Sequence, residues 1–199
     1  LQFVSDDRPS LAVIPLRPGA FETGHDAYGE ALADEVITAL SRMSGLHVIS
    51  RLSTTVFRDR DLDLQQIRQS LSVGYVLSGS FSTSGKAIRV HLELTDTRDG
   101  KVIWSDALRG QVQDAFDCDS DFVFGITSAV CSAIVSRELH RVQTRPMATL
   151  ESYALLFSAV SLMHRTVTND FTRSRQILEY LLDRGGRHPV VHACLAAWH

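Results

Sequence analysis

Apolar and polar residues alternate strictly in the middle of the chain, from Tyr75 to Trp104. The apolar positions Ile88, Val90, Leu92 and Leu94 alternate with Arg89, His91, Glu93 and Thr95. This period of two places one face of a strand on a core and the other face in water. Ser84-Gly85 and Asp99-Gly100 stand where hairpin turns are needed, because glycine tolerates the positive φ of tight turns. We therefore predict three antiparallel strands joined by two tight turns.

The part before this meander is predicted to alternate strands and helices. Apolar runs indicate strands, the first of them covered on both faces, whereas apolar residues that recur on one side indicate helices. The predicted elements are a strand over Leu11–Leu16, a loop over Arg17–Gly24, a helix over Asp26–Met43, a strand over Leu46–Ser50 and a helix over Asp63–Leu71 that Asp63 caps.

After the meander the spacing of apolar residues becomes helical. A long helix is predicted over Asp119–Leu139, so the order of elements up to this point is β-α-β-α-β-β-β-α. That order predicts an α+β (mixed α/β) sheet domain over residues 1–140, with helices packed on a mixed sheet. The polar segment 141–149, which contains Pro146, is predicted to be a linker.

Residues 150–199 have a purely helical pattern. Two helices are predicted over Glu151–Arg165 and Asn169–Asp183, the second capped by Asn169, and Pro189 is predicted to open a third helix after Gly185-Gly186. This arrangement resembles one tetratricopeptide repeat and the beginning of the next, whose period is about 34 residues. We therefore expect a truncated helical hairpin of that type at the end of the chain.

Composition excludes some functions. The chain has 199 residues, 44% of them hydrophobic and 22% charged, with a net charge of −3. It has no basic field to collect nucleic acid non-specifically. The uncharged stretch Phe122–Ser136 is shorter than the roughly 20 apolar residues that span a bilayer, so no membrane span is expected. Three cysteines at long spacings indicate free thiols rather than a disulfide framework.

Neither end of the sequence has the features of a natural terminus. The chain begins without Met and without the basic start and apolar core of a signal peptide, and it ends inside a predicted helix. We expect a piece of a longer polypeptide. Its localisation stays open, with the cytoplasm favoured over the periplasm.

Four segments together carry a family resemblance. In their order and spacing, Pro9–Leu16, Gly29–Arg51, Gly74–Asp106 and the helix Asp121–Ile134 resemble the TolB-like amino-terminal domain of bacterial signalling proteins. The loop Arg17–Asp26 departs from the family, which usually has a loop richer in Asn, Ser and Gly-Asp after its first strand. The resemblance therefore covers most of the sheet domain.

The resemblance implies a regulatory or interaction module and supplies no catalytic residues. In the family, tetratricopeptide repeats commonly follow this domain, and a class III adenylate or guanylate cyclase or a winged-helix DNA-binding domain commonly precedes it. A class III cyclase needs two metal-binding aspartates on a ferredoxin-like sheet, which this chain does not offer. A cyclase catalytic domain would therefore lie outside residues 1–199.

Two clusters contain residue types that bind metals, but neither has the arrangement that a metal site needs. Asp117, Asp119 and Asp121, near Asp114, have the first half of a calcium-loop spacing, but the later Gly and Glu positions hold Phe122 and Ser128. We predict that these carboxylates cap a helix. A second cluster comprises His188, His192, Cys194 and His199. Its members diverge around a helix, so neither a metal nor a cofactor is predicted.

Candidate nucleophiles fail in the same way. Ser78-Gly79-Ser80 lacks the spacing of a nucleophile elbow, and Gly79 is predicted to mark a bulge or a close backbone approach. The aspartates around Cys118 are expected to raise its thiol pKa, which disfavours a reactive cysteine. The aromatic residues Phe81 and Trp104 fit the core of the sheet.

The sequence therefore favours a non-catalytic regulatory module of a bacterial signalling protein, with an adenylate or guanylate cyclase as its output domain. Its expected partner is a protein or a second copy, as in a homodimer, and the outward side chains Arg89, His91 and Glu93 are the candidate interaction surface. The alternative is a small-molecule sensor of a membrane-bound winged-helix transcriptional regulator, with the loop Arg17–Gly24 lining an inter-domain cleft. No arrangement of catalytic residue types in the sequence supports a hydrolase or a transferase.

Overall fold

The computed structural model describes residues 8–19, 26–43, 45–57, 63–144, 152–163, 168–183 and 189–198. Contacts divide the chain into two compact units, a sheet unit over Pro9–Ile134 and a helical unit that contains Val135–His199. The elements are β1 (Ser10–Val13), β2 (Arg17–Pro18), α1 (Asp26–Ser41), β3 (His47–Val48), α2 (Arg51–Thr54), the 3-10 helix η1 (Thr55–Phe57), α3 (Leu64–Leu71), β4 (Tyr75–Ser84), β5 (Ala87–Asp96), β6 (Lys101–Gln111), the 3-10 helix η2 (Asp114–Phe116), α4 (Asp121–Thr144), α5 (Ser152–Met163), α6 (Thr168–Asp183) and α7 (Pro189–Trp198).

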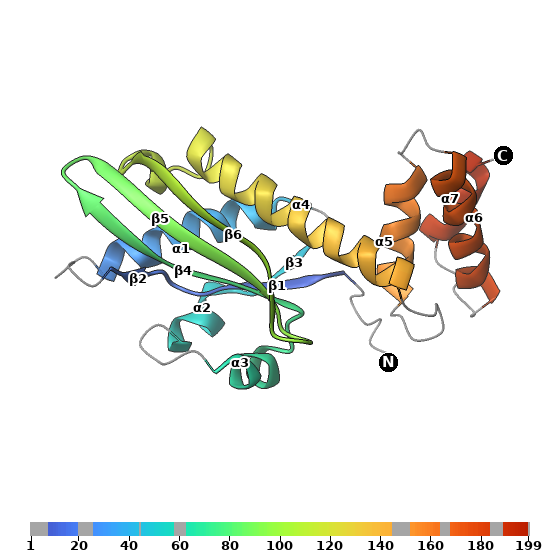
Figure 1. Ribbon diagram of the computed structural model, residues 1–199, viewed down its shortest axis with the longest axis horizontal. Coiled ribbons are helices and arrows are strands. Elements are labelled where there is room, and N and C mark those ends of the chain that lie inside the picture. The colour runs from blue at the N-terminus through green and yellow to red at the C-terminus, as the bar shows by residue number, and fades with distance from the viewer. Residues whose placement is uncertain are drawn as a thin grey trace. The chain divides into compact units, whose positions relative to one another are not determined.

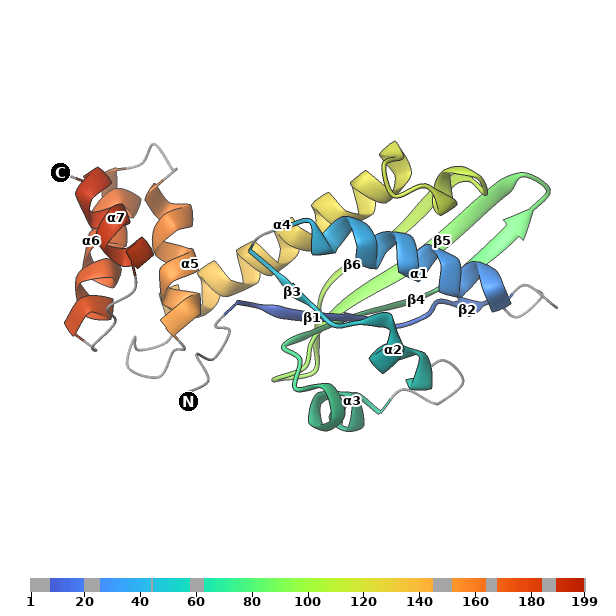
Figure 2. The ribbon, with the colours of Figure 1, turned by 180° about the vertical axis from the view of Figure 1, so that it is seen from behind.

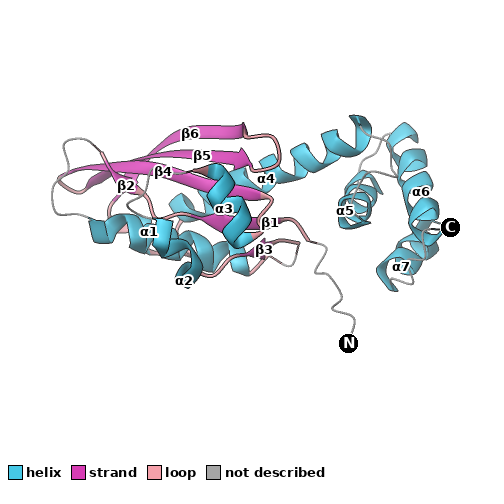
Figure 3. Ribbon diagram, turned by 90° about the horizontal axis from the view of Figure 1, so that it is seen from below, coloured by secondary structure: helices cyan, strands magenta, loops and turns pink. Residues whose placement is uncertain are grey.

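The sheet is mixed, which confirms the predicted fold class. Its strand order is β3-β1-β4-β5-β6, and β2 pairs beside β4. The first strands are parallel to one another, whereas β4, β5 and β6 form the predicted antiparallel meander (Figures 1 and 3). The glycines of both turns have positive φ, 63° at Gly85 and 69° at Gly100, so the turn prediction is also confirmed.

Helices cover the two faces of the sheet unequally. Leu11 and Val13 of β1 join the core under α1 and α4, whereas Ala12 of β1 and Ile14, which directly follows the strand, join a smaller core under α2, η1 and α3 (Figure 2). A strand buried on both sides needs apolar residues at every position, which explains the continuous run at Leu11–Leu16. The smaller core reaches only as far as β1 and the start of β4.

The helix α4 packs one side against the sheet. Val123, Ile126 and Val130 are fully buried there. By length and composition alone, the segment Asp121–Val142 would suffice to cross a membrane, with a mean hydropathy of 1.4, so the expectation that no segment approaches a span is wrong. One such helix is weak evidence of a membrane span, because the core helix of a water-exposed domain meets the same criterion.

The helical unit has a core of its own. Leu155 and Ala159 of α5 pack against Ile177 and Leu178 of α6, and Leu139 and Val142 near the end of α4 join them. The Ser174 hydroxyl donates a hydrogen bond to the Ala159 carbonyl oxygen at 2.9 Å. Nearby in the chain, the guanidinium of Arg141 pairs with the buried carboxylate of Glu138 at 2.8 Å.

Several boundaries differ from the sequence prediction. The first strand ends at Val13, the second comprises only His47–Val48, and the predicted loop Arg17–Gly24 contains β2. The short elements α2, η1 and η2 were missed, since three or four residues are too few to show a period. The second helix of the helical unit begins at Thr168, before its predicted cap. Helix α4 continues through the first four residues of the predicted linker 141–149, and the rest of that segment lies outside the described residues.

Candidate interaction surface

One face of the meander carries no helix over most of its area. We call it the uncovered face; its residues are Ser78, Ser80 and Ser82 of β4, Arg89, His91 and Glu93 of β5, and Ser105, Ala107 and Arg109 of β6. They form three rows in register, Ser82–Arg89–Arg109, Ser80–His91–Ala107 and Ser78–Glu93–Ser105. All the β5 and β6 members are exposed. The structure thus places the three predicted surface residues side by side on one strand.

The neighbouring β5 residues point into the core, as the alternation predicted. Ile88, Val90, Leu92 and Leu94 are at most 3% exposed. The alternation of exposed and buried residues stops at Thr95, which was expected to point into solvent but is buried; it stands opposite Val76, a residue of the smaller core. Phe81 is buried and Trp104 packs at the edge of the same core, so both belong to the sheet core as predicted.

Positive charge dominates one end of the uncovered face. Arg89 and Arg109 stand directly opposite each other, and like charges in such a pair destabilise a sheet. In the described part of the chain neither guanidinium has an ion pair or a hydrogen bond. Glu93 lies two rows away, and its carboxylate accepts a weak hydrogen bond of 3.4 Å from the Thr95 hydroxyl.

A shallow depression of about 330 Å³ lies in the middle of this face. Its polar lining comes from Arg17 of β2, the serines of β4 and β6, and His91 and Glu93. Gly79 also lines it. A Cβ at Gly79 would stand 2.0 Å from the carbonyl oxygen of His91. The predicted close backbone approach at Gly79 is therefore confirmed.

A second depression of about 680 Å³ lies between α3 and the β5–β6 turn. One wall is a buried ionic cluster. Asp96 is 1% exposed and accepts hydrogen bonds from Arg98 Nε at 2.7 Å and Nη2 at 3.1 Å. The same guanidinium donates to the Tyr75 hydroxyl at 2.5 Å and lies over the Tyr75 ring. Because Asp96 neutralises its charge, Arg98 has a structural role.

The acidic cluster before α4 is organised by its own neighbours. The atoms of Asp117, Cys118 and Asp119 that could coordinate a metal ion lie within 4.8 Å of one another. Arg42 donates to Asp119 at 2.5 Å and to the Cys118 sulfur at 3.4 Å; the hydrogen bond to Asp119 raises the pKa of Arg42. A protein cation therefore already neutralises the position that a metal would occupy.

The helix-capping prediction for these carboxylates needs correction. The Ser120 hydroxyl, not a carboxylate, accepts the hydrogen bond from the Val123 amide at the start of α4. Asp121 lies in the first turn, where its charge favours the helix dipole. Asp117 accepts a hydrogen bond from the Asp119 amide in the preceding turn.

The histidine and cysteine cluster of the helical unit is only partly described. His188 and His199 lie outside the described residues, His192 is exposed and Cys194 is half-buried on α7. In the sheet unit, burial raises the pKa of the Cys131 thiol, whose sulfur contacts that of Met43 at 3.0 Å. Among the described residues of these two arrangements, no nucleophile lies beside a base.

Sequence reasoning missed one residue of the uncovered face and one residue that lines its depression. Arg109 follows the meander's last predicted strand residue, Trp104, and β6 continues to Gln111. Arg17 was assigned to a loop, but β2 pairs it with Ser80. The alternation of Trp104, Asp106, Leu108 and Gly110 with polar residues was too weak to extend the strand from sequence alone.

Comparison with known proteins gives a family. The model described as "HilA/YgeH-like transcriptional regulator, second domain" matches residues 6–122, more than half of the chain. A relative from Rhizobium meliloti (strain 1021), named "Putative adenylate cyclase 3", is 24% identical over 189 residues, which is 95% of this chain but 32% of the relative. The chain thus spans about a third of that protein.

Solved structures that show some likeness to this chain include TolB from Acinetobacter baumannii and the lipoprotein GNA1162 from Neisseria meningitidis. TolB has a TM-score of 0.48 and 17% identity over 66% of this chain and 29% of its own. GNA1162 has a TM-score of 0.45 and 16% identity over 64% of this chain and 99% of its own. At these scores the likenesses say nothing about function.

Proposed function

Because the chain belongs to the family of HilA/YgeH-like transcriptional regulators, as their second domain, we propose that it is a non-catalytic regulatory module of a bacterial signalling protein. It acts by protein contact and biases an output domain elsewhere in the same polypeptide. The observation that carries the proposal is the uncovered face, an exposed sheet surface whose arginines have no partner in the described part of the chain.

The two sequence relatives suggest different output domains. The family description names a transcriptional regulator, and the Rhizobium meliloti relative is named as a cyclase. A module that fits both contexts supplies regulation rather than chemistry. For this chain we propose a cyclase as the output domain, because its likeness to the cyclase-named relative extends over 95% of its length, the helical unit included.

The helical unit is proposed to begin a tetratricopeptide array. Its helices α5 and α6 pack through small residues, with Ala154, Ser158 and Ala159 fully buried, and α7 follows as the first helix of a further pair. Stacked helix pairs of this kind form a concave surface for a partner. In this proposal the array and the uncovered face each offer a contact surface.

Alanine substitutions test the proposed surface. The variant Arg89→Ala/His91→Ala/Glu93→Ala keeps the buried side of β5 and is expected to retain the circular dichroism spectrum and unfolding midpoint of the wild type. We expect weaker assembly in analytical ultracentrifugation and altered output activity of the full polypeptide, measured as cyclic-nucleotide production and as reporter transcription. Unchanged assembly together with unchanged output would refute the proposal.

A second candidate function is small-molecule sensing. The specific observation in its favour is the depression of about 330 Å³ whose lining combines Arg17, His91, Glu93 and serine hydroxyls. A ligand that binds only the folded chain raises its unfolding midpoint with saturation. A thermal-shift screen with nucleotides and common metabolites tests this function, and Ser80→Leu, which fills the depression, should abolish any shift that a true ligand causes.

A further inference from the structure

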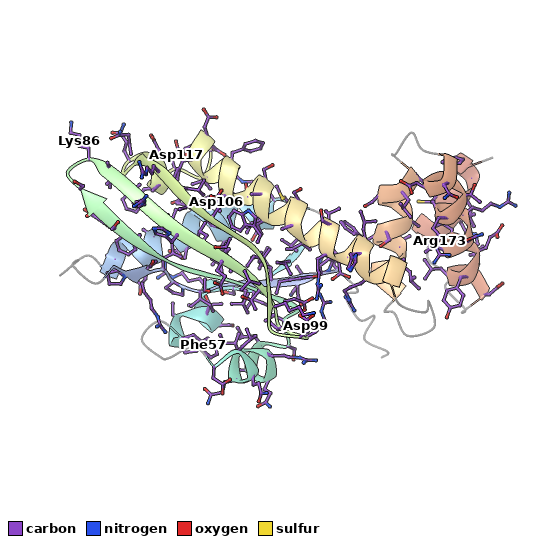
Figure 4. All side chains as sticks on the ribbon, viewed as in Figure 1. Phe57, Lys86, Asp99, Asp106, Asp117 and Arg173 are labelled. Carbon is purple, nitrogen blue, oxygen red and sulfur yellow. The ribbon has the colours of Figure 1, made fainter. Side chains whose placement is uncertain are left out.

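The charge pattern of the uncovered face is opposite to that of the whole chain. Two arginines, Arg89 and Arg109, stand against one carboxylate, Glu93, although the chain as a whole has a net charge of −3. Figure 4 shows Lys86 at the tip of the hairpin, beyond the Arg89–Arg109 row. The positive charge is therefore concentrated at one end.

Glu93 does not cancel this concentration. Four residues of strand separate Glu93 from Arg89, or about 13 Å, which exceeds the screening length of about 8–10 Å in physiological salt. The row Ser82–Arg89–Arg109 thus presents two adjacent guanidinium groups with a hydroxyl beside them. A carboxylate placed between the two arginines would relieve the repulsion of a like-charged cross-strand pair and accept charge-assisted hydrogen bonds from both.

We propose that the uncovered face binds an acidic polypeptide segment of a partner protein, with its carboxylates at Arg89 and Arg109. The inference rests on the proposed function and adds the chemistry of the partner. A protein segment fits better than nucleic acid for two reasons: the net negative chain lacks the field that collects a phosphate backbone, and none of the nine residues of the face is Phe, Tyr or Trp, the large aromatic side chains on which bases stack.

Binding of a short oligo-glutamate peptide tests this chemistry directly. Fluorescence anisotropy with the full chain is expected to show binding that weakens as sodium chloride is raised, because exposed charges are screened. Arg89→Ser/Arg109→Ser should lose about tenfold in affinity or more for each arginine removed. The matched control Arg173→Ser/Arg175→Ser removes two positive charges from α6 and should bind as the wild type does.

Four other outcomes overturn the inference. They are absence of binding, equal loss in the control variant, tighter binding of a DNA duplex than of the peptide, and self-association of the wild type that the Arg89→Ser/Arg109→Ser variant abolishes, which would assign the face to a second copy. Circular dichroism of each variant shows that it is folded. If the alanine variant of β5 alters output while the peptide fails to bind, the partner chemistry is wrong and the regulatory role stands.

Discussion

Removing the positive partner of a buried aspartate is expected to lower the free energy of unfolding of the sheet unit substantially. Arg98 is 19% exposed, and its guanidinium holds Asp96, which is 1% exposed, through two hydrogen bonds. The substitution Arg98→Met keeps much of the side-chain volume but leaves the carboxylate buried without its counter-charge. Breaking a buried pair from one side costs about 3–5 kcal/mol, and the lost contact with the Tyr75 ring adds to this.

The expected loss is large relative to the whole. Domains of this size have a free energy of unfolding of about 5–15 kcal/mol, so a loss of about 4 kcal/mol removes a quarter or more of it. Urea unfolding followed by circular dichroism measures the change as a lower midpoint at unchanged slope. We expect the double variant Asp96→Asn/Arg98→Met to recover part of the loss, because it no longer buries the Asp96 charge without the Arg98 guanidinium.

The reasoning fails on either of two results. A loss below about 1 kcal/mol for Arg98→Met would mean that water or another group solvates Asp96 in the variant. A double variant as unstable as the sum of the two single variants would mean that the two side chains act independently. The exposed ion pair of Arg175 with Glu179 supplies the control, since Arg175→Met should cost no more than about 0.5 kcal/mol.

Three further substitutions test the packing and the buried groups. Gly79→Ala places a methyl group 2.0 Å from a backbone oxygen and should destabilise by about 2 kcal/mol or more, whereas Gly125→Ala, on the open side of α4, should stabilise by about 0.5–1 kcal/mol in urea unfolding; equal effects would contradict the geometry. Burial raises the pKa of Cys131, so the native state keeps this proton longer and stability should fall as pH rises above about 8.5, the ordinary thiol pKa. Cys131→Ala should lessen that fall, and an unchanged slope in unfolding at successive pH values refutes it. Glu138→Leu removes the carboxylate that pairs with the buried Arg141, and should lower the thermal midpoint of the helical unit by the equivalent of about 3 kcal/mol; no shift would show the pair to be dispensable.

The meander could be predicted from sequence because its signals are local. Alternation along β5 and glycines at Gly85 and Gly100 determine strand faces and turns without reference to the rest of the chain. The burial of Thr95 could not be predicted, since it depends on its pairing with Val76 of the smaller core. The same holds for the arginine pair of the uncovered face. Arg89 was recognised as outward-facing, but its opposition to Arg109, twenty positions later, follows from register alone.

The buried ionic cluster also could not be predicted from the sequence. Asp96, Arg98 and Asp99 look like ordinary polar residues of a turn, and nothing in their spacing indicates that Asp96 is buried against Tyr75 while Asp99 lies on the turn itself (Figure 4). Only the folded sheet brings residue 75 beside residue 96. Local patterns thus predicted most elements, whereas the charged contacts that distinguish one surface from another arose from tertiary pairing.

The most direct test of the central claim is the output activity of the intact polypeptide that carries this chain. Cyclic-nucleotide production and reporter transcription are compared for the wild type, Arg89→Ser/Arg109→Ser and Arg173→Ser/Arg175→Ser at equal expression. A regulatory module that works through the uncovered face predicts a changed output in the first variant and wild-type output in the second. Wild-type output in both variants would contradict the account.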